Sequence, residues 1–566
     1  MKKDNFLRIV ALLMVCSFMV NSCQKNVLDK APLDSYNDAN VWSSIPLSQA
    51  YASRLYNALP SFKYDWWNSD RFGSYGLSAI SDEGYNQYNL LNSNDWNTGA
   101  VTATTNDGKM DSWSPMFSFI QIANLFFANI DKVPSTGPSD EAAIAKMKGE
   151  TYYLRAYCYT NLAMKYGGLP LISKAFDVNS NFDVPRSDFP ATVAFIVADL
   201  DRAASLLPTS FTGADLGRVT KGSSLALKSR ILLHAASPYW NTSNNVSLWQ
   251  AASDAAKAVI DLNVYSLSAK YADIFRNDLN NPEIITQHLT YGGTEWGGGG
   301  SIVYPERYQS PGGFQGWAAY TPSQNLVDAY NTIDGKMITD PASIYNPQNP
   351  YANRDSRLFA TILYDGVPYL APQFSKSRYD AGATNVVEFW QGGFDSPTGA
   401  GGSGETKTGY TFKKYVDTTY DWQAGKPSPG KVWVESRLGE IYLNYAEAEF
   451  NLGRPAIAAI YINKLRSRAG ITTPLAASDI TLQRIQNERQ VELAFEGFRF
   501  FDVRRWKIAE ITENAPLMGV VITKTGNTKF YQFKTVQQRS FKQSMYLFPI
   551  PQNEILRSSL QQNPLY

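Results

Sequence analysis

Apolar residues that recur every three or four positions set the strongest constraint on how this chain folds. In residues 188–207 this spacing puts one apolar stripe on a helix, and Pro208 ends the run. Residues 139–166 repeat the pattern, with Ser139 suited to a helix N-cap and Gly167 as a stop. Because each stripe must be buried against a neighbour, the sequence predicts amphipathic helices that pack together. The stripe of the 188–207 segment consists of Phe189, Val193, Ile196, Leu200, Ala203 and Leu207.

Two further predicted helices follow each other with only a short break. An apolar stripe runs through residues 438–452, Gly453 breaks the helix, and Pro455 opens a second striped helix, which is typical of an antiparallel pair. No clean repeat of about 34 residues is visible, but the number of helices fits a stack of tetratricopeptide-like pairs. We therefore predict a mainly α protein. The other helical segments are 42–59, 113–131, 222–236, 247–261 and 479–496.

The segments between these helices are long and rich in Gly, Asn and aromatic residues. They cover residues 60–110, 285–320 and 365–432. Loops of this length in a compact protein usually have a function. The chain has 566 residues, so we expect either two domains or one elongated helical framework that carries large insertions.

The charge balance excludes one class of function. The 52 Lys and Arg residues nearly cancel the 51 Asp and Glu residues, and no block of basic residues stands out. A nucleic-acid-binding protein needs clustered positive charge to displace counterions from phosphates. The sequence therefore predicts no nucleic-acid partner.

The first residues have the pattern of a bacterial export signal. Basic residues precede the apolar run Ile9–Val20, which is too short to span a bilayer. The run leads into Val20-Asn21-Ser22-Cys23, which resembles the lipobox of bacterial lipoproteins, in which the cysteine receives the lipid. We predict a signal peptide at residues 1–22 and lipidation of Cys23. Asn21 departs from the strict pattern, which leaves an uncleaved signal or cleavage at another position as alternatives.

Cysteine usage predicts a protein without an intrachain disulfide. Cys16 lies in the signal, so Cys158 is the only other thiol of the mature chain besides the lipidated Cys23. An exported protein of this kind must obtain its stability from its core rather than from covalent links.

Three glutamates raise the question of catalysis. Glu488, Glu492 and Glu496 lie at successive spacings of four, which places them on one face of the predicted helix, beside arginines. Paired carboxylates can serve as general acid and base in a glycosidase. We favour an ion-pair network along the helix face, because these residues lie in regular helix rather than in a cleft loop. Asp82 and Glu83 are likewise given a structural role, as capping groups of the framework. No catalytic residue is predicted.

Metal and cofactor motifs are not found in the sequence. The two histidines, His234 and His288, lie far apart and in no ligand spacing, so no metal ligand is assigned. Calcium held by carbonyl and carboxylate oxygens leaves no motif, and that question stays open. The glycine clusters lack the Gly-Lys-Ser/Thr of a phosphate loop, and no Gly-x-Ser-x-Gly elbow occurs, so no cofactor is expected.

Aromatic residues within the polar loops are the candidate ligand-binding groups. Sugar rings stack their apolar faces on aromatic rings, and their hydroxyls need polar partners around the rim. For any single tryptophan, burial beneath a loop is the more common outcome, and Trp317 could equally be structural. As a group, these residues favour a glycan-binding surface. The candidates are Trp67, Tyr85, Asn94, Trp96, Tyr291, Trp296, Trp317 and Trp390, with Trp66, Tyr88, Asp95 and Trp422 near them.

Several motifs, taken in order, resemble the SusD/RagB family of outer-membrane nutrient-binding lipoproteins of Bacteroidetes over nearly the whole chain. The matching segments are Ser81-Asp82-Glu83, Ile120–Asn124, Lys148–Leu171, Thr321–Tyr330, Asn353–Arg357, Glu440–Glu449, Asn487–Lys507, Leu547–Pro551 and Gln562–Tyr566. The resemblance implies a SusD-like fold with four tetratricopeptide-like helix pairs and a loop-rich variable region that carries minor β-structure. It also implies a surface receptor that binds oligosaccharide and closes over a SusC-like TonB-dependent transporter.

This resemblance defines the expected organisation. The body spans residues 23–566, with a tether at 24–34, framework helices at about 35–285 and 430–566, and ligand loops at about 60–110 and 285–432. The leading hypothesis is a non-enzymatic, lipid-anchored, surface-exposed glycan-binding protein of the outer membrane. The alternatives are a surface glycoside hydrolase or lyase with an unrecognised site, and a structural or adhesive surface lipoprotein without a small ligand.

Overall fold

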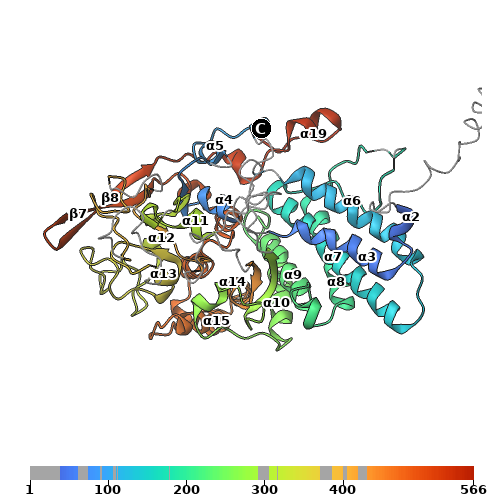
Figure 1. Cartoon of the computed structure of the whole chain (residues 1–566), viewed down its shortest axis with the longest axis horizontal. Helices are drawn as coiled ribbons and strands as arrows, with labels where there is room; N and C mark the ends of the chain where they lie inside the picture. The colour runs from blue at the N-terminus through green and yellow to red at the C-terminus, as the bar shows by residue number, and fades with distance from the viewer. Residues whose placement is uncertain are drawn as a thin grey trace, which may run out of the picture.

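The computed structural model describes residues 38–60, 74–89, 92–105, 110, 112–177, 179–180, 182–290, 305–314, 316–369, 385–398, 405–417 and 430–566. A stack of helices forms one lobe, on the right in Figure 1, and short elements joined by long loops form the other. None of the helices in these ranges combines the length and apolar character that crossing a bilayer requires.

The helical lobe is built from pairs of neighbouring helices. α3 packs on α6, α7 on α8, α9 on α10 and α14 on α15, and each pair also contacts the next through α6 with α7, α8 with α9 and α10 with α14. This arrangement confirms the predicted mainly α, tetratricopeptide-like fold. The bounds are α3 (Ile45–Ser53), α6 (Trp113–Asn129), α7 (Pro138–Tyr166), α8 (Phe189–Leu206), α9 (Lys221–Ala236), α10 (Val246–Ile260), α14 (Leu438–Asn451) and α15 (Pro455–Arg468).

Helix boundaries follow the local chemistry of the sequence. The Asp188 side chain accepts a hydrogen bond from the Ala191 N–H and caps α8, whose predicted stripe is largely buried. α7 begins one residue earlier than expected, because Pro138 occupies its first position and Ser139 lies inside its first turn. α7 ends at Gly167, whose φ of 79° is a conformation that glycine adopts without strain.

Two predicted helices are shorter than their apolar pattern. The expected helix 42–59 consists of α3 and a 3₁₀ turn at Arg54–Ala58, and the separate α2 (Asp38–Val41) lies before it. The expected helix 479–496 is α16 (Leu482–Glu492), which starts after its cap Thr481. Phe495 adopts a φ of 61°, so the chain leaves the helix before Glu496.

The loop-rich lobe contains short helices and small antiparallel sheets. Its pairs are β1 (Gly84–Asn86) with β3 (Tyr320–Pro322), β2 (Ile284–Thr290) with β6 (Lys431–Arg437), β4 (Ile362–Leu363) with β5 (Thr411–Phe412), and β7 (Leu517–Thr525) with β8 (Thr528–Gln537). The hairpin of β7 and β8 projects from the left end of the molecule (Figure 1). The remaining short helices are α4 (Ser74–Ala79), α5 (Ser93–Asn97), α11 (Pro305–Gln309), α12 (Gln324–Ala329), α13 (Ser356–Thr361), α17 (Arg499–Arg505), α18 (Ala509–Thr512) and α19 (Gln552–Arg557).

Each lobe has its own hydrophobic core. The helical lobe buries residues of α6, α7, α8 and α9 together with Phe548 from the C-terminal region. The loop-rich lobe buries a separate set that includes Phe314, Leu326, Phe412 and Phe495. Long loops therefore rest on a packed base of their own, which can hold side chains at the surface in fixed positions.

Candidate functional site

Pairing of β1 with β3 brings two of the aromatic loop segments together. Gly84, Tyr85 and Asn86 lie opposite Pro322, Thr321 and Tyr320. A Cβ atom on Gly84 would lie 2.9 Å from the Thr321 carbonyl oxygen, so the close approach of the two strands needs glycine at this position. The strands thereby place residues 84–88 of the first segment beside residues 317–322 of the second.

Three partly exposed aromatic residues gather beside this sheet, and we call Tyr85, Tyr88 and Trp317 the β1–β3 aromatic cluster. The Tyr88 hydroxyl donates to the Trp317 carbonyl oxygen at 3.0 Å, while 43% of Tyr88 remains exposed. The buried ring of Tyr308 packs edge to face against the ring of Trp317, with 5.7 Å between the ring centroids. Partial burial raises the pKa of the Tyr88 hydroxyl, which therefore stays protonated and able to donate.

Charged side chains from the third loop segment border the cluster. The Lys407 ammonium lies 5.7 Å from the centroid of the Tyr85 ring, a cation–π arrangement. Glu405 lies near enough to Tyr88 for its charge to contribute to the raised pKa of that hydroxyl. Aromatic faces with a cation and a carboxylate at their edge form a surface suited to a polyhydroxylated ligand.

The structure places Trp96 in the core instead of at this surface. Its side chain is only 3% exposed, and its ring lies 4.3 Å from Phe548 and 6.2 Å from Phe500. The expectation of a solvent-facing platform at Trp96 is therefore corrected, because C-terminal residues far away in sequence cover the ring. The neighbouring Asn94 accepts a hydrogen bond from the Gln537 amide at 3.0 Å and joins its loop to the end of β8.

Trp390 lies against the β7–β8 hairpin. The Lys524 ammonium sits 4.7 Å from the Trp390 ring, and the Gln391 N–H donates to the Ile522 carbonyl oxygen at 2.7 Å. Trp390 is half-buried, so one part of its ring supports the hairpin. The remaining predicted residues lie outside the described ranges, and their assignments stay predictions: they are Cys23, Trp66, Trp67, Tyr291, Trp296 and Trp422.

The three glutamates considered for catalysis take part in a buried ion-pair network. Arg437 binds Glu492 at 2.6 Å and Glu496 at 2.8 Å, and Arg357 binds Glu488 at 2.6 Å. Neighbouring guanidinium groups lower the pKa of Glu492 and Glu496 despite their burial, so both stay ionised. A general acid needs a raised pKa and access to substrate, whereas Glu492 and Glu496 have a lowered pKa and all three glutamates are buried. The ion-pair hypothesis is confirmed.

The partners in this network differ from the expected ones. The glutamates pair across elements, with Arg357 of α13, Arg437 of β6 and Arg468 of α15, instead of with arginines along their own helix. Asp82, expected as a capping group, forms a bidentate pair with Arg499, with both bonds 2.7 Å long. The network ties the loop-rich lobe to the last helix pair.

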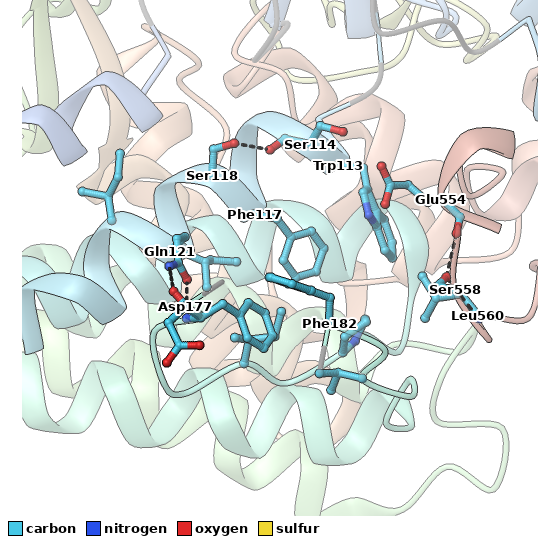
Figure 2. Close-up of a pocket in the computed structure, with 16 residues that line it drawn as sticks. Trp113, Ser114, Phe117, Ser118, Gln121, Asp177, Phe182, Glu554, Ser558 and Leu560 are labelled. Atoms are coloured by element: carbon cyan, nitrogen blue, oxygen red, sulfur yellow. Dashed lines mark hydrogen bonds between the residues drawn. The ribbon is translucent and has the colours of Figure 1, made fainter. Parts of the chain in front are cut away.

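A pocket between α6 and α19 is a feature that sequence reasoning missed. It has a volume of about 750 Å³ and is lined by α6, by residues of the segments 170–177 and 182–184, and by residues of the segment 554–560. Figure 2 shows Gln121 and Asp177 at one end, Glu554 and Ser558 at the other, and Phe117 between them. We call it the α6–α19 pocket. Its side walls include Trp113, Phe117, Ile172, Phe176, Phe182 and Leu560.

Among the residues that the structure describes, no group of three or more His, Cys, Asp or Glu side chains is arranged to hold a metal ion. Burial lowers the pKa of His234 to about 3, which keeps its imidazole neutral within the helical core. Cys158 is a free thiol buried in the same core, and burial raises its pKa above the ordinary value.

The stacked helix pairs place this chain in the class of helical-repeat proteins. Its loop-rich lobe adds an aromatic surface. The family model described as the SusD family matches residues 282–566, and a second model, described as starch-binding associating with outer membrane, matches residues 31–233. The chain belongs to the SusD family.

Individual relatives agree with this assignment. The SusD-like protein P38 of Formosa agariphila is 24% identical over 539 residues, which cover 90% of this chain and 93% of that protein. A crystal structure of a SusD-like protein from Bacteroides fragilis has a TM-score of 0.77 at 28% identity and covers 95% of this chain and 100% of the other. A SusD-like carbohydrate binding protein from the same species has a TM-score of 0.72 at 21% identity, with 92% and 99% covered.

Proposed function

We propose that this protein is a lipid-anchored, surface-exposed glycan-binding protein that captures oligosaccharide at the β1–β3 aromatic cluster and delivers it to a SusC-like TonB-dependent transporter. The observation that carries the proposal is the convergence of Tyr85, Tyr88 and Trp317, from two distant loop segments, beside Lys407 and Glu405 of the third. A binding function without catalysis agrees with the use of the candidate acid and base residues in buried ion pairs.

The chemistry of the cluster suits a sugar ring. The apolar C–H face of a pyranose stacks on an aromatic ring, and the Tyr88 hydroxyl, the Lys407 ammonium and the Glu405 carboxylate provide both donors and acceptors for the sugar hydroxyls. The cluster rests on a packed core, so little ordering cost accompanies binding. A surface site of this kind gives modest affinity, which allows the ligand to be passed on.

The relatives support the location and the ligand class. One matching family model carries the description of starch-binding in association with the outer membrane, and one similar structure is named a carbohydrate binding protein. The predicted lipid on Cys23 provides the anchor, and the transporter partner follows from the resemblance to the family.

A glycan array followed by calorimetry tests the proposal. Tyr88 is the variant site of choice, because its exposure lets Tyr88→Ala remove a stacking ring without opening a core cavity. We expect glycan affinity to fall several-fold to about tenfold, the effect of losing one aromatic contact. Trp67→Ala and Trp296→Ala extend the series to predicted residues outside the described ranges.

Phe182→Ala is the matched control, because Phe182 is an exposed aromatic residue, 62% accessible, on the helical lobe. It should leave glycan affinity unchanged. Release of shortened sugars from any glycan of the panel would overturn the non-enzymatic assignment. Failure to bind any glycan would favour a structural surface protein instead.

A further inference from the structure

The α6–α19 pocket lies on the helical lobe, on elements other than those that carry the β1–β3 aromatic cluster. Two sides of it come from segments far apart in the sequence, α6 and the 554–560 segment, and the third comes from residues of the segments 170–177 and 182–184. Figure 2 shows that these parts surround one continuous space, and its volume of about 750 Å³ is within the range of small-ligand and side-chain binding pockets.

The walls of the pocket are mainly apolar and partly open to water. Phe182 is 62% exposed, and its ring lies 5.1 Å from the ring of Phe176. Phe117 and Ile172 are half-buried on the opposing sides. A cluster of aromatic side chains left at the surface is unfavourable in water unless it is covered, so this site has the character of an interaction surface.

Several polar groups along the walls already have hydrogen-bond partners. Both polar atoms of the Gln121 amide bind the Phe176 backbone, at 3.0 and 3.1 Å. The Ser118 hydroxyl donates to the Ser114 carbonyl oxygen at 2.9 Å, and the Ser558 hydroxyl donates to the Glu554 carbonyl oxygen at 2.6 Å. A glycan carries hydroxyls around its whole ring, and the mainly apolar walls leave most of them without a polar partner. The pocket therefore suits an apolar side chain better than a sugar ring.

The charge at the two ends of the pocket is negative. Asp177 lies at one end and Glu554 at the other (Figure 2). None of the described residues that line the pocket is Lys, Arg or His. Both carboxylates offer acceptor oxygens, so they favour a positively charged group held beside an apolar one.

We propose that the α6–α19 pocket docks a polypeptide segment of a partner protein, a segment that presents an aromatic or branched apolar side chain next to Lys or Arg. The apolar side chain enters between Phe117, Phe176 and Phe182, and the cation faces Glu554 or Asp177. Charge complementarity selects this occupant over an anionic lipid headgroup, which both carboxylates repel, and the apolar walls select it over a glycan, whose hydroxyls would lack partners there. The site is separate from the proposed glycan surface.

A second copy of the chain is the competing occupant. The β7–β8 hairpin projects from the loop-rich lobe and exposes Phe530 (50%) and Phe533 (41%) beside Lys534, so it has the required chemistry; the nearby Lys529 is already paired with Asp365. Sedimentation analysis of the full chain over a range of concentrations distinguishes the two. Self-association that is abolished by Phe530→Ala would overturn the assignment to a separate partner, whereas a monomer at all concentrations supports it.

An array of synthetic hexapeptides is the direct test. Each peptide has Phe, Trp, Leu or Ser at a central position and Lys, Ser or Glu on both sides, and the full chain is applied as the probe. We expect binding by peptides that combine an apolar centre with flanking Lys, and loss of binding when the centre is Ser or the flanks are Glu. Equal binding of Lys-flanked and Glu-flanked peptides would overturn the proposal, as would the absence of binding by every peptide.

Variants then locate the binding site for the best peptide. Phe182→Ala should weaken its affinity about tenfold, because a half-exposed ring loses its apolar contact area. Glu554→Gln should weaken it about two- to fivefold and reduce the salt dependence, as expected for a solvent-screened ion pair. Tyr88→Ala is the control, which should leave peptide binding unchanged while it reduces glycan binding. Peptide affinity that is unaffected by both Phe182→Ala and Glu554→Gln would show that the peptide binds elsewhere.

Discussion

The indole ring of Trp96 packs against Phe500 and Phe548 within the core of the helical lobe. Removing a buried ring leaves a cavity that the surrounding side chains fill only partly. Trp96→Ala should therefore lower the free energy of unfolding by about 3–5 kcal/mol. Urea denaturation measures this change, with Tyr88→Ala as the exposed counterpart that should cost less than about 1 kcal/mol.

The same variant separates packing from binding at Trp96. Glycan affinity of the folded Trp96→Ala protein should equal that of the parent, because the ring is 3% exposed and cannot stack on a sugar. Weaker glycan binding at unchanged stability would contradict the burial of this ring and return Trp96 to the ligand surface.

Glu83 is buried directly before β1, and its charge state couples stability to pH. Burial raises the pKa of its carboxyl to about 8, and the charge of Asp82 adds to this effect. The folded protein therefore binds a proton that the unfolded chain releases near its ordinary pKa, so the contribution of Glu83 to stability is greatest at low pH and falls as pH rises from about 4.5 to about 8.

Glu83→Gln tests this coupling, because glutamine is neutral throughout the range. The free energy of unfolding of the variant should decrease less between pH 5 and pH 8.5, by on the order of 4 kcal/mol. Chemical denaturation at a series of pH values measures the slope. Glu513, whose pKa burial raises to about 7, contributes in the same direction, so part of the slope should remain. Parallel profiles for parent and variant would show that Glu83 is ionised in the folded protein.

Among the elements, helices were the easiest to predict from the sequence. The stripes of α7, α8, α14 and α15 were visible because a helix repeats its buried face within a few residues. The end of α16 could not be predicted from the sequence. The glutamates keep their spacing of four through residue 496, and this spacing gives no sign of the left-handed conformation of Phe495. Local periodicity reports which face is buried, but tertiary contacts decide where a helix stops.

Contacts between segments that are far apart in the chain could not be predicted from the sequence. The pairing of β1 with β3 joins Tyr85 to Thr321, and short strands of this kind carry little periodic signal. The α6–α19 pocket likewise exists only when Trp113 and Glu554 meet. Loop composition identified Tyr85 and Trp317 as candidates, but it could not separate them from Trp96, whose burial depends on the C-terminal Phe548.

At the scale of the whole molecule, the two lobes carry two different surfaces. The β1–β3 aromatic cluster combines aromatic faces with donors and acceptors, whereas the α6–α19 pocket combines aromatic walls with acceptors and negative charge. The proposed glycan surface and the proposed docking pocket lie on different lobes, so one site does not occlude the other.

Attachment to the outer membrane through Cys23 is part of the proposed function, and Cys23→Ser tests it. Loss of the lipid removes the only anchor that the sequence predicts, so the variant should move from the outer-membrane fraction to the soluble fraction. Ser22→Ala, which keeps the cysteine, is the control and should stay in the membrane.

Glycan affinity of Cys23→Ser should be unchanged, because the β1–β3 aromatic cluster is built from residues far along the chain. Growth on the bound glycan should fail. A variant that stays in the membrane fraction with unchanged detergent extraction would show that Cys23 does not carry the anchor.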